Sequence, residues 1–125
     1  MPKVSKRSSE AKGHGPVLEH SGDVGGYTIN FVTFRDDMDQ TPLLKGLPND
    51  SCHSPHWGYV LKGQLRFRLD DREEVFEAGD AFYLPPGHIG IGNEPETEYL
   101  QFSPAKELQE VRATIMKNMQ AMQGG

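Results

Sequence analysis

The chain has 125 residues, of which 35% are hydrophobic and 9% aromatic, with 14 glycines and 9 prolines. From this length we expect one domain and no second catalytic domain, because most domains span about 50–200 residues. Lysine and arginine number 13 against 18 aspartates and glutamates, which gives a formal net charge of -5. An acidic folded body does not attract phosphate backbones, so the composition argues against nucleic-acid binding.

Residues 1–16 are predicted to form a disordered basic tail, because almost none of their side chains can be buried. This segment lacks the apolar stretch of a signal peptide, and no apolar run in the chain approaches the ~20 residues of a membrane span. The single cysteine, Cys52, excludes an intramolecular disulfide and fits a reducing compartment. The sequence therefore predicts a cytoplasmic protein without membrane contact.

Residues 17–103 have the pattern of an all-β domain. Tyr27 to Phe34 is rich in β-branched and aromatic residues and predicts a strand. Residues 64–70 alternate apolar and polar side chains, which predicts a half-buried strand. Strands and turns then recur at roughly the 8–12 residue spacing of a sandwich or barrel, ending with a strand over residues 97–103. Residues 36–55 are dense in turn formers and predict a long irregular loop.

The hydrophobic period changes in the last segment, residues 104–125. Its apolar residues lie at helical intervals, at Leu108, Val111, Ile115, Met119 and Met122. Such a stripe predicts a C-terminal α-helix that packs on its own sheet or on a dimer mate.

Potential metal ligands crowd into the end of the long loop. Asp50, Cys52, His53 and His56 lie within seven residues, and His88 follows a Pro-Pro-Gly turn. Imidazole, thiolate and carboxylate groups bind divalent transition metals. In a regular strand Cys52 and His56 share a face while His53 points the other way, which favours Cys52 as a ligand. A bulge at the proline between the two histidines would instead favour His53.

A shared ion also requires the chain to bend. Residues 52 and 56 of a regular strand are about 13 Å apart at ~3.3 Å per residue, so we expect a bend near Ser54 and Pro55. His88 has to come from a neighbouring strand. The alternative is that Cys52 is a small buried thiol and that His56 and His88 are hydrogen-bonded pocket residues without a metal.

Three further residues are candidates for a substrate pocket. Tyr99 and Gln101 share one face of a strand, and Tyr83 lies on the strand that leads to His88. All three are expected to line a barrel interior, with ordinary core packing as the alternative. Trp57 has the opposite parity to His56, and we expect it to pack between sheets or subunits.

The stretch HWGYVLKGQLRF, followed by GDAFYLPPGH, resembles the two consecutive motifs of the cupin superfamily. The resemblance covers roughly residues 27–103 and implies a double-stranded β-helix, an all-β barrel of two antiparallel sheets. The string CHSPHWGYVLKG together with PPGH is similar to short single-domain bacterial cupins of mostly uncharacterised type. Cupin resemblance also implies a homodimer.

The ligand positions of the first cupin motif carry other residue types here. When Gly63 is aligned with the last glycine of that motif, Asp50 and Cys52 occupy the two histidine positions. His56 then occupies the glutamate position. The resemblance therefore implies a site of altered composition in the usual place.

The second motif departs from the family at its ligand position as well. When Gly79 is aligned with its first glycine, Pro85 and Gly87 fall in their expected places. Gly90 then takes the histidine position, and His88 lies two residues before it, which on a strand is the same face.

We therefore expect Cys52, His56 and His88 to hold a divalent transition metal, namely iron, manganese, nickel or zinc, beside a small organic molecule. Cupin resemblance implies oxygenase, isomerase or lyase chemistry without selecting among them, so enzymatic activity stays open. The alternative is a metal-free barrel that binds a small molecule as a sensor or carrier, because fold alone does not determine function.

Overall fold

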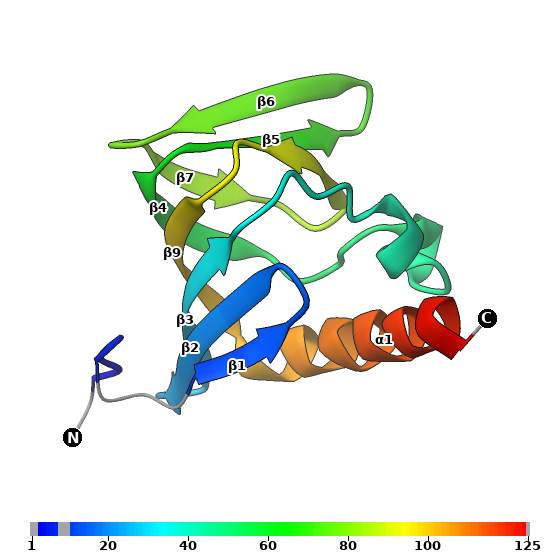
Figure 1. Cartoon of the computed structure of the whole chain (residues 1–125), viewed down its shortest axis with the longest axis horizontal. Helices are drawn as coiled ribbons and strands as arrows, with labels where there is room; N and C mark the ends of the chain where they lie inside the picture. The colour runs from blue at the N-terminus through cyan, green and yellow to red at the C-terminus, as the bar shows by residue number, and fades with distance from the viewer. Residues whose placement is uncertain (1–2, 8–10, 125) are drawn as a thin grey trace.

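Two antiparallel sheets and a C-terminal helix make up the computed structural model, which describes residues 3–7 and 11–124 (Figure 1). The strands are β1 Ala11–His14, β2 Val17–Val24, β3 Tyr27–Phe34, β4 His56–Lys62, β5 Gln64–Leu69, β6 Arg72–Glu77, β7 Ala81–Leu84, β8 His88–Asn93 and β9 Thr97–Pro104. The short 3-10 helices η1 Thr41–Leu44 and η2 Pro48–Asp50 lie in the loop before β4, and helix α1 spans Ala105–Gly124. The expected all-β barrel with a C-terminal helix is confirmed.

The strand order explains how distant segments meet. The larger sheet has the order β1-β2-β3-β9-β4-β7, and the smaller one has the order β6-β5-β8. The loop with η1 and η2 carries the chain from β3 to β4, and β9 separates those two strands in the sheet. This order places the start of β4 close to β9 and, through the preceding loop, close to β8.

The main core lies between the two sheets and follows the alternation of the strands. Leu65, Phe67 and Leu69 of β5 are buried while Arg68 is exposed, as the alternating sequence predicts. The other buried members come from the larger sheet and are Val32, Phe34, Val60, Phe82, Leu84 and Tyr99. Residues from four strands of one sheet and one strand of the other thus hold the barrel closed.

Helix α1 lies along one side of the barrel, away from the smaller sheet (Figure 1). Leu108 and Val111 are buried, so the first part of the apolar stripe packs on the helix's own domain, whereas Met122 at its end is 62% exposed. Near the other end of the helix, Asn118 Nδ2 donates to the carbonyl oxygens of Leu43 at 2.7 Å and Lys45 at 2.9 Å. Within the described residues, no helix combines the length and apolar content needed to cross a bilayer.

The N-terminal region is more ordered than the sequence predicts. Residues 11–14, expected in a disordered tail, form β1 and pair with β2 through residues 17–20. Gly15, with φ of 61°, permits the tight reversal between them, and backbone hydrogen bonds order a segment that has little apolar surface. Further toward the N-terminus, Lys6 forms an ion pair with Glu98. Residues 1–2 and 8–10 of the expected tail, and residue 125, lie outside the described residues.

Candidate metal centre

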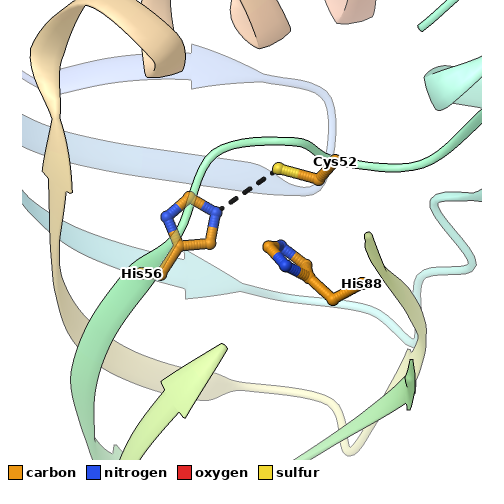
Figure 2. A group of neighbouring side chains, drawn as sticks. All are labelled: Cys52, His56 and His88. Atoms are coloured by element: carbon orange, nitrogen blue, oxygen red, sulfur yellow. Dashed lines mark hydrogen bonds between the residues drawn. The ribbon is translucent and has the colours of Figure 1, made fainter. Parts of the chain in front are cut away.

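Cys52, His56 and His88 converge in the barrel interior. Each offers one ligand atom, and these atoms all lie within 4.8 Å of one another. Figure 2 shows the three side chains pointing toward a common centre. Cys52 Sγ is 3.5 Å from His56 Nε2, and the centroids of the two imidazole rings are 4.8 Å apart. All three residues are buried, with exposed fractions of 5%, 6% and 3%.

The backbone fixes two of these residues relative to each other. Cys52 and His88 form an isolated antiparallel bridge, in which Cys52 N donates to His88 O at 3.0 Å. Gly87 N donates to Cys52 O at 2.8 Å. The chain bends at Ser54, as the sequence analysis requires, and His56 is the first residue of β4. This bend brings Cys52 and His56 together where a regular strand would separate them.

Each imidazole is oriented by a hydrogen bond at its Nδ1. His88 Nδ1 lies 2.8 Å from Pro85 O, and His56 Nδ1 lies 2.6 Å from Ser103 Oγ. A carbonyl oxygen only accepts, so His88 Nδ1 carries the hydrogen and the neutral ring presents the lone pair of Nε2. Such outer contacts fix the orientation of imidazole ligands in metal sites.

Burial sets the protonation states of the cluster. It lowers the pKa of His88 to about 4. Burial also holds the pKa of His56 well below its usual range, and His88 and Arg112 add to the effect. The pKa of the Cys52 thiol shifts upward instead, because burial raises it to about 11. At neutral pH both imidazoles are therefore neutral and ready to donate a lone pair, whereas the thiol must lose a proton to bind a metal.

Two other potential ligands lie outside the cluster. Asp50 is exposed, and its Oδ1 accepts a hydrogen bond from Gly46 N at 3.0 Å. His53 Nε2 is 3.2 Å from Glu110 Oε1 of helix α1. Strand parity, which favours Cys52 over His53, agrees with this arrangement.

A pocket of about 310 Å³ adjoins the cluster, and Cys52, His56 and His88 form part of its wall. Tyr99 and Gln101 also line the pocket, as the sequence analysis expects. Burial raises the pKa of the Tyr99 hydroxyl, which keeps it protonated. Most of the remaining lining is apolar and comes from β3, η1 and the inner face of α1.

The expectation that Tyr83 lines the pocket is wrong. Tyr83 is 49% exposed, and its ring centroid lies 5.2 Å from that of Trp57 on the outside of the larger sheet. Phe82 and Leu84, its neighbours on β7, are the residues that enter the core. Because side chains alternate along a strand, Tyr83 must face outward.

A polar group that also lines the pocket was not predicted from the sequence. Arg112 Nη2 donates to Asn30 Oδ1 at 2.9 Å and lies 3.5 Å from Glu19 Oε1. The sequence contained one indication, because Asn30 is an amide on the predicted buried face of β3, between Thr28 and Val32. Ser103 was also missed: its side chain contacts His56, and it lies in β9 just before the helix.

Comparisons with known proteins agree with this fold. Residues 49–90 match the family model of the cupin domain. A comparison with curated proteins gives no match. The chain is similar to the structure of an RmlC-like cupin from Shewanella frigidimarina NCIMB 400, with 17% identity and a TM-score of 0.59, covering 80% of this chain and 87% of that one.

Two further solved structures are similar to this chain. KdgF from Halomonas sp. has 19% identity and a TM-score of 0.60, with 81% of this chain and 93% of that one covered. The polyketide cyclase RemF from Streptomyces resistomycificus has 18% identity and a TM-score of 0.58, with 83% and 79% covered. At these identities the likeness shows the fold alone. Together with the match over residues 49–90, it shows that the chain contains a cupin-domain segment and has the cupin fold.

Proposed function

We propose that this cupin holds a divalent transition metal through Cys52, His56 and His88 and acts on a small organic molecule in the adjoining pocket. The observation that carries the proposal is the convergence of three buried ligand atoms within 4.8 Å. Three protein ligands leave coordination positions open, as catalytic metal sites do and closed structural sites do not.

The donor set fits a transition metal. One sulfur and two imidazole nitrogens suit zinc, iron or nickel better than magnesium or calcium, which prefer oxygen ligands. When bound, the metal would supply Lewis-acid activation of a substrate oxygen. The chain itself would orient the ligand nitrogens through the bonds at Ser103 and Pro85, and the apolar walls would exclude water.

A metal-free binding site is the second candidate, and one observation favours it. Each member of the cluster has a hydrogen-bond partner in the protein, because His56 contacts Ser103, His88 contacts Pro85, and the Cys52 thiol is 3.7 Å from Ser54 O. In that case the barrel would bind a small molecule as a sensor or carrier, with Nε2 of each histidine turned toward the ligand.

The metal content of the untagged protein, purified without chelator, distinguishes the two functions. We expect about one iron, manganese, nickel or zinc ion per chain by mass spectrometry, because the cluster offers one site. A variant with Cys52→Ser, His56→Ala and His88→Ala should contain none, whereas His53→Ala is the matched control and should keep its metal. If the folded wild-type protein stays metal-free even after dialysis against each of the four ions, the metal proposal fails. The metal-free small-molecule site is then the remaining candidate function.

The predicted homodimer also belongs to this proposal, with a second copy of the chain bound to the outside of the larger sheet. An outer apolar face, which spans β3, β9, β4 and β7, supports it. Its members are each 38–49% exposed and are Tyr27, Trp57, Tyr59, Leu61, Tyr83 and Phe102. Together they expose roughly 400–500 Å² at ~150–250 Å² per aromatic side chain. That is about half of the ~800 Å² per partner in a standard interface.

Cytoplasmic location stays a prediction from the sequence.

A further inference from the structure

The pocket that adjoins the metal cluster is also lined by a buried amide with an unused donor. Asn30 of β3 is 1% exposed, and its Nδ2 has no hydrogen-bond partner among the described residues. Arginine only donates, so the contact with Arg112 fixes the amide with Oδ1 toward the guanidinium and Nδ2 away from it. A buried donor without a partner is unfavourable, because it has lost its hydrogen bonds to water and gained none. Such a group therefore calls for an acceptor that the protein itself does not supply.

The guanidinium beside this amide has capacity for a further ligand. Arg112 lies on α1, lines the pocket, and has a side chain that is 32% exposed. Its contacts to Asn30 and Glu19 are both made through Nη2, so neither uses Nε or Nη1. These two contacts hold the planar group in place, and a guanidinium held in this way can bind both oxygens of a carboxylate.

The charge of the lining favours an anion. Among the described residues that line the pocket, Lys12 and Arg112 are cationic and Glu19 is anionic. The pocket therefore has a net positive charge in a protein whose formal net charge is -5. Because field lines concentrate in clefts with apolar walls, this local excess attracts small anions into the pocket.

The remaining walls define the rest of the ligand. They are formed mainly by aliphatic, aromatic and methionine side chains, and the volume is about 310 Å³. This volume lies at the lower end of the range for small-molecule sites, ~300–1,000 Å³. A ligand that fits has an apolar body and a single anionic group.

We propose that Arg112 is the specificity-determining residue of this pocket and binds the carboxylate of a small organic acid, with Asn30 as the residue that positions it. The inference rests on the proposed function in one respect, namely that a small molecule occupies the pocket. It does not require a metal. The carboxylate lies against the helix wall, and the apolar body of the acid extends toward Cys52, His56 and His88.

Two pairs of probes test this proposal, each a carboxylate and its neutral amide of nearly the same shape. They are benzoate with benzamide and hexanoate with hexanamide, titrated into wild-type protein by calorimetry. We expect at least one carboxylate to bind about tenfold or more tightly than its amide, because a charge-assisted pair with arginine is stronger than a neutral hydrogen bond. Equal affinities within both pairs, or no binding of either carboxylate, would overturn the proposal.

Variants assign the preference to Arg112. Arg112→Gln should remove it, whereas Lys117→Gln, which removes an exposed cation from the same helix, should keep it. Asn30→Asp is a second variant that keeps the shape of the side chain and supplies a carboxylate that competes for the guanidinium, so it should also remove the preference. A preference that survives in Arg112→Gln would sink the assignment.

The same titrations with metal-free and zinc-loaded protein separate this proposal from the proposed metal function. A preference that depends on Arg112 in both forms supports the subsite, even if the purified protein contains no metal. A preference that appears only with zinc and is unchanged in Arg112→Gln means that the carboxylate binds the ion. That result would overturn the subsite and support the metal site.

Discussion

The backbone amide of Cys52 donates to the carbonyl oxygen of His88 at 3.0 Å, and this contact joins the loop before β4 to the first residue of β8. Main-chain hydrogen bonds thus hold Cys52 and His88 next to each other, and the thiol and the imidazole take no part in these bonds. Substitution of either side chain should therefore leave this backbone bridge in place.

Metal binding should release a proton from Cys52. Burial raises the pKa of this thiol to about 11, so it is protonated at pH 7–8, whereas His88 with a pKa of about 4 is already neutral. Zinc titrated into metal-free protein should therefore release about one proton per chain. Calorimetry in buffers of different ionisation enthalpy measures this number. Cys52→Ser should release close to none, and an unchanged value in that variant would exclude the thiol as a ligand.

Acid should destabilise the metal-free protein through its buried imidazoles. The pKa of His88 falls from 6.5 to about 4 on folding, so between these values the unfolded chain binds a proton that the folded chain does not. The free energy of unfolding therefore decreases as the pH falls through this window, by about 3 kcal/mol in total for His88. Urea unfolding at a series of pH values measures the slope.

Two histidine variants identify the source of this slope. His88→Asn should flatten the decrease in stability between pH 6.5 and pH 4.5, whereas His53→Asn, at the contact with Glu110, should follow the wild type. Equal slopes in wild type and His88→Asn would contradict the assignment to His88.

Ser103 should affect metal affinity without being a ligand. Its Oγ lies 2.6 Å from His56 Nδ1 and orients the ring. Ser103→Ala should weaken zinc binding by about 10–100-fold, as the loss of an outer hydrogen bond does in other metal sites. Competition with a chromogenic chelator measures the affinity. Thr28→Val removes a buried hydroxyl from the residue paired with Ser103 in the neighbouring strand and should leave zinc affinity unchanged.

The two glycines that align with the cupin motifs should differ in their tolerance of alanine. Both have positive φ, 85° at Gly63 and 97° at Gly79. A Cβ at Gly63 would lie 2.9 Å from Thr97 Cα and would also collide with Thr97 Oγ1, whereas a Cβ at Gly79 meets nothing within 4 Å. Gly79→Ala should therefore lower stability by about 1–2 kcal/mol from backbone strain alone. Gly63→Ala should lose a further ~1–3 kcal/mol from the clash.

Thermal and urea unfolding of the two glycine variants measure this difference. Equal losses in both would mean that the chain near Thr97 relaxes around the new methyl group.

The outer apolar face should mediate dimer formation. A double variant, Trp57→Glu and Tyr83→Glu, places two charges on adjacent strands of this face and should convert a dimer to a monomer. Val75→Glu is the matched control, because Val75 is 47% exposed on β6 of the other sheet. Sedimentation at micromolar concentration measures the mass. A wild-type protein with the mass of one chain, or a double variant that stays dimeric, would contradict the proposed interface.

Much of the barrel was predictable because its signals are local. The alternation of residues 64–69 fixes which side of β5 is buried, and β3 has the bounds that its β-branched and aromatic residues predict. Tyr83 was placed wrongly because its orientation was inferred from His88, which lies on the next strand beyond a turn. Alternation holds only within one strand, and in β7 the buried residues are Phe82 and Leu84, so Tyr83 faces outward.

The candidate site was predictable only in part. Strand parity and the bend at Ser54 relate Cys52 to His56, because both are near in sequence. Arg112 could not be placed in the same way, since its position depends on how α1 docks against strands far away in the chain. The β1 strand was missed for another reason: it is held by backbone hydrogen bonds, which leave no pattern of apolar side chains.

Helix α1 forms one wall of the pocket and takes part in neither sheet. Its far end is tied to the loop by Asn118, and a hydrogen bond from Ala105 N to Gly26 O at 3.0 Å joins its first residue to the larger sheet. Because the helix belongs to neither sheet, its opening would break these contacts while every strand pair stays intact. Such a local opening requires less free energy than unfolding of the barrel. The amide hydrogens of α1 should accordingly exchange with solvent faster than those of β9.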